Sequence, residues 1–158
     1  MGDGDVFCFL GMNFCDELLG LQKNNTKAAE LWLKGAALGS VPAQYHIAIA
    51  YNQGLGVERD EKKAVHFYQL AAMGGDVISR FNLGVHEKDD MAGMSRAIAH
   101  WKIAAGAGFE LALDNIEQLL VFDALAEEEY ERVLDAYLTS QDEMKSAQRE
   151  MAEKVYHP

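Results

Sequence analysis

The amino-acid sequence predicts an all-α fold, an α-α superhelix (solenoid) of about four helical hairpins followed by a C-terminal capping helix. The composition supports this prediction, because 49% of the 158 residues are hydrophobic and only two are prolines, as in helix-rich globular chains. Internal repetition supports it more strongly, since the chain matches itself at shifts near 35 residues, the signature of stacked hairpins. We expect one helical-repeat domain over residues 1–158.

The repeat is defined by columns of similar residues. Residues 27–47 align with residues 63–83 at a shift of 36 without a gap, and a further shift of 33 adds a third copy. An alanine column and an aromatic column recur in these copies, formed by Ala36, Ala72, Ala105 and by Trp32, Tyr68, Trp101. The expected repeats span about 2–39, 40–75, 76–108 and 109–138, and the expected capping helix spans 140–156.

The first helix of a hairpin is clearest in residues 42–53. Ala43, Ile47 and Tyr51 fall on one face of a helix with 3.6 residues per turn. Pro42 suits the start of this helix, and Gly54 suits its end because glycine readily adopts the left-handed conformation.

The second helix is predicted over residues 61–73, with Asp60 as its N-cap and Gly74-Gly75 as its end. The aromatic column lies one turn before the alanine column. A large residue beside a small one allows two helices to pack closely. A single hairpin cannot bury such a face, so the hairpins are expected to stack.

Gly54-Leu55-Gly56 has two interpretations, a phosphate-binding loop or a turn between helices. A dinucleotide-binding loop requires a preceding strand and a third glycine, and neither is found in the sequence. We therefore predict a turn.

The last units depart from the repeat. The third unit has EKDDMAGMSR where the glycine-containing loop is expected, and the fourth carries Asp114 and Glu117 in its first helix. A degraded last unit is typical of a capping repeat. An apolar stripe in the terminal helix is expected to pack on the last hairpin and shield the end of the stack, through Met144, Ala147, Met151 and Val155.

The charge is acidic and uneven. The net charge is −11, and residues from Glu110 onward hold 13 acidic and 4 basic side chains. Acidity argues against nucleic-acid binding, which requires a basic face. The acidic end is interpreted as a solvated cap, with a site for a basic partner as the alternative.

Cysteine usage and the apolar runs indicate the compartment. Cys8 and Cys15 are seven residues apart, roughly 10 Å along a helix, which is too far for a disulfide. The start MGDGDVFCFLG has no basic region before an apolar run, and no 18 consecutive apolar residues occur. We expect a cytoplasmic protein. Gly2 matches a glycine that follows a second helix, so the array either starts here or continues a longer one.

The stretch AQYHIAIAYNQGLGVERDEKKAVHFYQLAAMGG closely resembles the Sel1-like repeat, an αα-hairpin relative of the tetratricopeptide repeat. The resemblance covers about residues 2–120, and the later part is similar to repeat proteins of unicellular algae. The matching positions are Ala43, Ile47, Tyr51, Gly54, Gly56, Val57, Asp60, Lys63, Ala64, Tyr68, Ala71, Ala72 and Gly75.

The resemblance implies a non-catalytic scaffold or adaptor that binds a protein or peptide on a concave face lined by the first helices. By the tetratricopeptide pattern, the tentative peptide-binding residues are Tyr45, Ile49, Asn52, Phe81, Val85, Lys88 and Gln118. The same columns also contain Cys8, Met12, Cys15, Asp114 and Val121. Tyr45 and Phe81 have an alternative interpretation as packing residues between neighbouring helices. We expect a monomer that binds neither nucleic acid nor membrane.

No catalytic residue, metal or cofactor is expected. None of the five histidines has another histidine at i+3 or i+4, the spacing of a helical metal site. Gly39-Ser40 lacks the G-x-S-x-G elbow of a nucleophilic serine. The alternative function is a small-ligand-binding or hydrolytic protein, which a closed apolar pocket with convergent titratable groups would favour.

Overall fold

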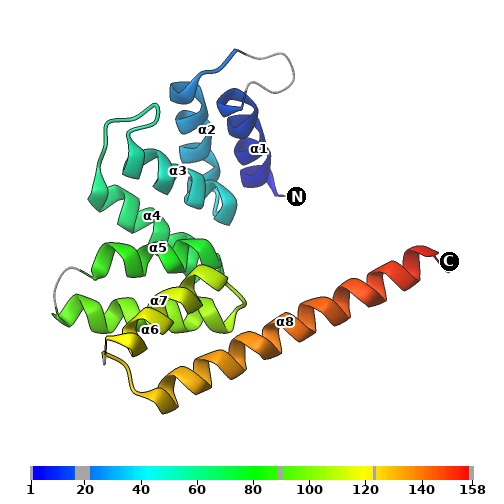
Figure 1. Ribbon diagram of the computed structural model, residues 1–158. Coiled ribbons are helices and arrows are strands. Elements are labelled where there is room, and N and C mark those ends of the chain that lie inside the picture. The colour runs from blue at the N-terminus through cyan, green and yellow to red at the C-terminus, as the bar shows by residue number, and fades with distance from the viewer. Residues whose placement is uncertain (1, 17–21, 89–90, 123, 157–158) are drawn as a thin grey trace. The chain divides into compact units, whose positions relative to one another are not determined.

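The computed structural model describes residues 2–16, 22–88, 91–122 and 124–156 (Figure 1). The described residues form eight α-helices and no strand, which confirms the all-α class. The helices are α1 (Asp3–Cys15), α2 (Asn25–Ala37), α3 (Val41–Gln53), α4 (Glu61–Met73), α5 (Val77–Glu87), α6 (Met91–Gly106), α7 (Glu110–Val121) and α8 (Glu127–Tyr156).

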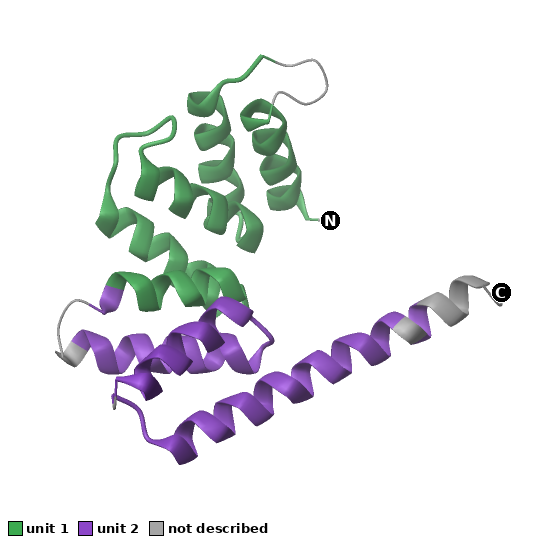
Figure 2. Cartoon of the chain, in the orientation of Figure 1, with its two compact units in different colours: residues 1–86 green, residues 87–158 purple. Residues whose placement is uncertain are grey.

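The chain divides into two compact units, Met1–His86 and Glu87–Pro158 (Figure 2). The first unit contains α1 to α4 and almost all of α5, and the second contains α6 to α8. Each unit is described by itself, and the single domain expected from the sequence stays a prediction.

The first unit is built from the predicted columns of large and small residues. Helix α1 packs on α2, α2 on α3, and α3 on α4. Trp32 and Tyr68 are buried, as are Ala36 and Ala72 four residues after them. One core cluster joins α1, α2 and α3, and a second joins α3, α4 and α5. The alternation of aromatic and alanine therefore places the core where the sequence predicts it.

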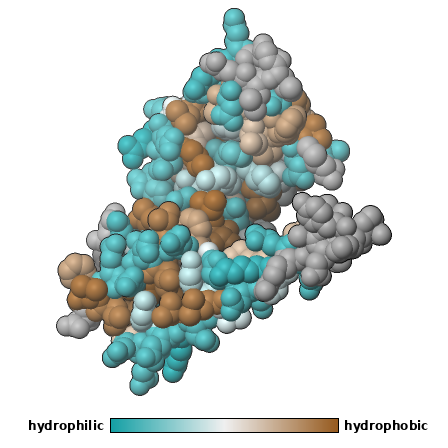
Figure 3. Space-filling view, turned by 45° about the vertical axis from the view of Figure 1, so that its right-hand side comes forward, coloured by the Kyte–Doolittle hydropathy of each residue, from teal (hydrophilic) through white to brown (hydrophobic). Residues whose placement is uncertain are grey.

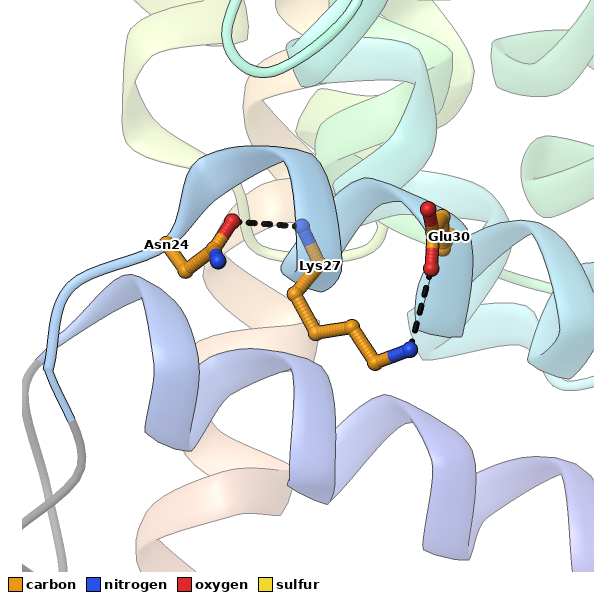
Figure 4. Close-up of polar contacts among 3 residues, drawn as sticks. All are labelled: Asn24, Lys27 and Glu30. Atoms are coloured by element: carbon orange, nitrogen blue, oxygen red, sulfur yellow. Dashed lines mark hydrogen bonds and ion pairs between the residues drawn. The ribbon is translucent and has the colours of Figure 1, made fainter.

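Side-chain caps fix where the helices begin. The Asn24 side chain accepts a hydrogen bond from the Lys27 backbone N–H at 2.9 Å, and the Lys27 ammonium pairs with Glu30 at 3.0 Å (Figure 4). Asp60 caps α4 in the same way at 3.0 Å, which confirms the prediction. Helix α3 begins at Val41, one residue earlier than predicted. Its N-cap is Ser40, whose side chain accepts a hydrogen bond from the Ala43 backbone N–H. Each such cap typically contributes about 1 kcal/mol.

The two glycines of the loop between α3 and α4 have positive φ, 74° at Gly54 and 73° at Gly56. Gly54 ends α3, and its N–H donates to the Ala50 carbonyl. Gly56 lies against the start of α2, where an added Cβ would come within 2.1 Å of the Asn25 carbonyl oxygen. The loop is thus a turn, as predicted, and it also contacts the preceding hairpin.

The second unit repeats the packing of the first with a shorter connection. Trp101 and Ala105 of α6 are buried, as are Ala112 and Ile116 of α7. Helix α6 begins at Met91, so residues expected in a loop form its first turn instead. Its 16 residues make it three residues longer than the 13-residue α4.

The prediction of a separate capping helix over residues 140–156 is wrong, because these residues are the second half of α8, one helix of 30 residues. No glycine or proline interrupts residues 127–156, and Thr139 satisfies its hydroxyl by donating to the Asp135 carbonyl one turn back. Val133 is buried and the Gln141 amide donates to the Gly108 carbonyl at 3.2 Å.

Among the described side chains, the expected shielding by the end of α8 is found only at Met144, whose methyl group lies beside Gly108 after α6 although the residue is 42% exposed. Met144, Ala147 and Met151 are exposed, and the side chain of Val155 lies outside the described part. Helix α8 runs past α6 and α7 instead of folding its last turns onto them (Figure 1).

Gly56→Ala is expected to destabilise the protein by about 3 kcal/mol or more, because the new Cβ meets a backbone carbonyl at a left-handed position. Gly54→Ala is the matched control, since its φ is the same but its nearest neighbour is 3.5 Å away, so strain alone should cost about 1 kcal/mol. Urea denaturation measures both. Equal losses would contradict the contact between the loop and α2.

Ala72→Trp is expected to lower the free energy of unfolding by about 3 kcal/mol or more, because the site is buried between helices and has no room for an indole. The neighbouring Met73→Trp serves as the control, since Met73 is exposed and the change should stay within about 0.5 kcal/mol. A thermal or urea melt of Ala72→Trp that matched the parent protein would place this column outside the core.

Candidate peptide-binding surface

Five of the predicted peptide-binding residues lie on two helices of the first unit. Tyr45, Ile49 and Asn52 follow one face of α3 at i, i+4 and i+7, and all three are half-buried. Phe81 and Val85 are one turn apart on α5, where Phe81 is half-buried and Val85 is 37% exposed. We call these five residues the α3–α5 surface.

The α3–α5 surface rests on the second core cluster. Tyr45 and Ile49 pack against buried residues that include Tyr68 of α4 and Leu83 of α5. Their partial burial means that both interpretations of Tyr45 hold in part, since it packs between helices and still reaches the surface. The cluster fixes the side chains that a partner would meet.

Polar groups lie beside this cluster. Burial raises the pKa of Tyr68 to about 12, with smaller contributions from nearby Tyr45 and Asp76. Burial and Asp76 likewise raise the pKa of Tyr45. The His86 ring lies 5.8 Å from the Tyr68 ring, and its Nδ1 is 3.1 Å from a Glu61 carboxylate oxygen. The Tyr45 and Tyr68 hydroxyls stay protonated at neutral pH, so they can donate hydrogen bonds but do not act as bases.

The remaining predicted positions are not part of the α3–α5 surface. Cys8 is buried in the core beside Trp32 and Ala43, so its expected place on a concave face is wrong. Burial raises the pKa of its thiol to about 11. Met12 and Cys15 are half-buried against the same cluster.

Lys88 and Gln118 are exposed and belong to the second unit, as do Asp114 and Val121. Lys88 follows the end of α5, and the other three are on α7. The predicted residues of α3 and α5 thus belong to the first unit, where Tyr45 and Ile49 pack against a cluster that includes Leu83 of α5, and the α7 residues belong to the second.

The second unit has a hollow of about 480 Å³ between α6 and α8. It is lined by Ile103, Val133 and Ala136 together with charged side chains. Two of these, Lys102 and Glu129, form an ion pair with each other, so they do not converge on a ligand. Within the described ranges, no three metal-ligating side chains gather at one point.

A comparison with known protein families finds a match for the first two hairpins. The family model described as Sel1 repeat matches residues 8–40 and 41–76. These matches contain Trp32, Tyr68, Ala36 and Ala72 of the two columns, the Gly54-Leu55-Gly56 turn and three of the five residues of the α3–α5 surface.

Two solved structures share the fold. One is c5321, a protective antigen present in uropathogenic Escherichia coli strains and displaying an SLR fold, with a TM-score of 0.72 and 22% identity. The other is a Sel1 repeat protein from Oxalobacter formigenes, with a TM-score of 0.73 and 20% identity. They cover 87% and 89% of this chain. Residues 8–76 of the chain match the Sel1 repeat family, and the fold resembles that of these two structures.

The chain spans only part of both structures, 31% of the first and 57% of the second. Its fold is an all-α solenoid of helical hairpins. No curated protein matches the sequence. No described helix is both long and apolar enough to cross a bilayer.

Sequence reasoning missed His86 and its pairing with Glu61. A signal was present, because His86 occupies a column that holds Asn13 in the first hairpin and Ala50 in the second. A titratable ring at a position that is otherwise small or neutral marks a departure from the repeat. Its partners lie on α4 and could not be read from the α5 sequence alone.

His46, beside Tyr45 on α3, is expected to make the stability depend on pH. Its ring stacks on Trp32 at a centroid distance of 5.1 Å, and burial lowers its pKa, partly opposed by Asp16 and Asp76. The unfolded chain, with a histidine pKa near 6.5, then binds the proton more readily than the folded chain. The stabilising contribution of neutral His46 is complete above about pH 6.5 and declines as the pH falls below it.

Urea denaturation between neutral and mildly acidic pH measures this effect. His46→Gln should flatten the decline over this window, and His66→Gln, at an exposed site on α4, should leave it as in the parent. Parallel pH profiles for the parent and His46→Gln would show that His46 is not the titrating group.

Proposed function

We propose that this Sel1-like repeat protein is a non-catalytic interaction module that binds a protein or peptide on the α3–α5 surface. The observation that carries the proposal is a set of apolar side chains that reach the surface of two helices of the first unit, Ile49 on α3 and Phe81 and Val85 on α5, with Ile49 packed against a core cluster that includes Leu83 of α5. Sel1-like repeat proteins typically act as interaction scaffolds. The chain's own geometry supports this role.

The chemistry of this set suits a peptide with apolar side chains. Val85 is exposed and Ile49 and Phe81 are half-buried, so an incoming apolar side chain would lose water without first moving the core. The Asn52 amide and the protonated Tyr45 hydroxyl are polar groups of the same surface. An amphipathic helix or an extended segment would meet both kinds of contact.

The small-ligand or hydrolytic alternative has less support. None of the five residues of the α3–α5 surface lines the charged pocket at the loop between α3 and α4, which Tyr51 and Asp60 line nearby. The raised pKa values of Tyr45 and Tyr68 make their hydroxyls poor nucleophiles. A surface without an activated group fits binding better than catalysis.

The test is capture of partners from a lysate followed by affinity measurement with the identified partner or its peptide. Val85→Glu should weaken binding at least about tenfold, because it places a charge in the centre of an apolar contact. Met73→Glu is the matched control, since Met73 is an exposed apolar residue on α4, and should bind as the parent does.

Circular dichroism should show both variants folded, since neither residue is buried. Equal affinities of the parent and Val85→Glu would overturn the assignment of this surface. Turnover of a small molecule that is lost in Val85→Glu would favour the alternative function.

A further inference from the structure

The hollow between α6 and α8 is a second candidate binding site, formed by the second helices of the third and fourth hairpins. Its lining is largely apolar. Val133 of α8 is buried and Ile103 of α6 is 54% exposed, while Ala126 and Ala136 are exposed. Its volume of about 480 Å³ is typical of sites that enclose a ligand or a side chain. An apolar side chain that enters the hollow loses contact with water, which favours binding.

Packing between α6 and α8 holds the hollow in shape. Lys102 of α6 and Glu129 of α8 line it and form an ion pair. A Cβ added at Gly106 would lie 3.6 Å from the Ala136 Cβ, so the two helices are close where α6 ends. The hollow is therefore formed mainly by two packed helices. Because the Lys102 and Glu129 charges neutralise each other, this pair offers a partner no net charge.

Helix α8 also carries charges beside the hollow that form no ion pair within the described ranges. Glu128 and Arg132 line the hollow one turn apart, and helical spacing puts Glu131 and Asp135 beside them. All four side chains are exposed. We call these four residues the α8 rim. The rim holds three carboxylates and one guanidinium, so its net charge is negative.

The negative charge of this region exceeds the positive charge of the helix start. The first turn of a helix contributes about half an elementary positive charge, whereas residues 110–135 hold nine acidic side chains and one basic side chain. A cationic group near the α8 rim is therefore attracted. Charge complementarity favours a basic partner over an acidic or neutral one.

A second hollow adjoins the first at the start of α8. It has a volume of about 510 Å³ and shares Ala126 and Glu129 with the first. Two leucines line it, and the neighbouring Val121 and Phe122 are 74% and 77% exposed. The space-filling view shows hydrophobic side chains, in brown, at the surface among hydrophilic ones, in teal (Figure 3). Apolar surface thus continues beyond the α6–α8 hollow, so a segment with several apolar side chains has room to bind.

We propose that the α6–α8 hollow binds a basic amphipathic segment of a partner protein. An apolar side chain of the segment enters the hollow, and its lysine or arginine side chains lie against the carboxylates of the α8 rim. The proposal goes beyond the proposed function, because the site lies on second helices of the second unit and the α3–α5 surface lies on first helices. It favours the basic partner that the acidic composition left as an alternative, since the hollow supplies the apolar half of such a site.

Fluorescence anisotropy with a labelled peptide of leucine and lysine, patterned as an amphipathic helix, tests the site. The full chain should bind this peptide, and added salt should weaken the binding because exposed charges are screened. Two control peptides keep the pattern, one with glutamate in place of lysine and one with serine in place of leucine. Neither control peptide should bind detectably.

Ile103→Asn should weaken binding of the lysine peptide at least about tenfold, because it removes apolar lining from the hollow without changing the charge. Leu111→Asn is the matched control. Leu111 of α7 is also 54% exposed and does not line the hollow, so this variant should bind as the parent does.

Glu128→Lys should weaken binding about fivefold, because it replaces an attractive rim charge by a repulsive one. Glu58→Lys changes the net charge equally at an exposed site in the first unit and should bind as the parent does. Arg132→Gln removes the one cation of the α8 rim and should strengthen binding. Circular dichroism should show all these variants folded, since each replaced side chain is exposed.

Several results would overturn the proposal. These are a parent protein that does not bind the lysine peptide, equal affinities of the parent and Ile103→Asn, and equal binding of the glutamate peptide. Self-association that Ile103→Asn abolishes would assign the hollow to a second copy of the chain instead. Val85→Glu should leave the affinity for the lysine peptide unchanged, and a loss in that variant would place the peptide on the α3–α5 surface.

Discussion

Close approach of helices at alanine is the constraint on which the rest of the structure depends. Ala28, Ala43, Ala64, Ala97 and Ala112 have no exposed surface at all. A methyl group allows two helix backbones to come near each other, while Trp32, Tyr68 and Trp101 fill the wider space beside the contact. Alanine also has the highest helix propensity, so one residue type satisfies both the local structure and the packing between helices.

Much of this could be predicted from the sequence because the constraint repeats. The columns of Ala36 and Trp32, the turn at Gly54 and Gly56, and the cap at Asp60 all depend on local geometry or on the repeat period. The continuity of α8 could not be predicted in this way. An apolar stripe has the same period in one helix as in two, and Thr139 remains in the helix because its hydroxyl bonds to the preceding turn.

For the candidate surface, the sequence predicts which residues share a helix face but not how deeply each side chain is buried. The columns group Tyr45 with Ile49 and Phe81 with Val85, since helix periodicity decides which residues share a face. They do not say how far a side chain reaches. Cys8 and Tyr45 share a column, yet the short thiol is enclosed by the core and the longer phenol extends to the surface. The groups near Tyr68 belong to different helices, so only the assembled hairpins bring them together.

The contact between Gly56 and the Asn25 carbonyl has a consequence for how the hairpins open. A turn that touches the hairpin before it cannot swing away without exposing the first backbone amides of α2. The first two hairpins are therefore linked at their tips as well as along their helices, so fraying that starts in one is expected to reach the other. Hydrogen exchange of the amides near Asn25 would then report on the integrity of a loop some thirty residues later in the chain.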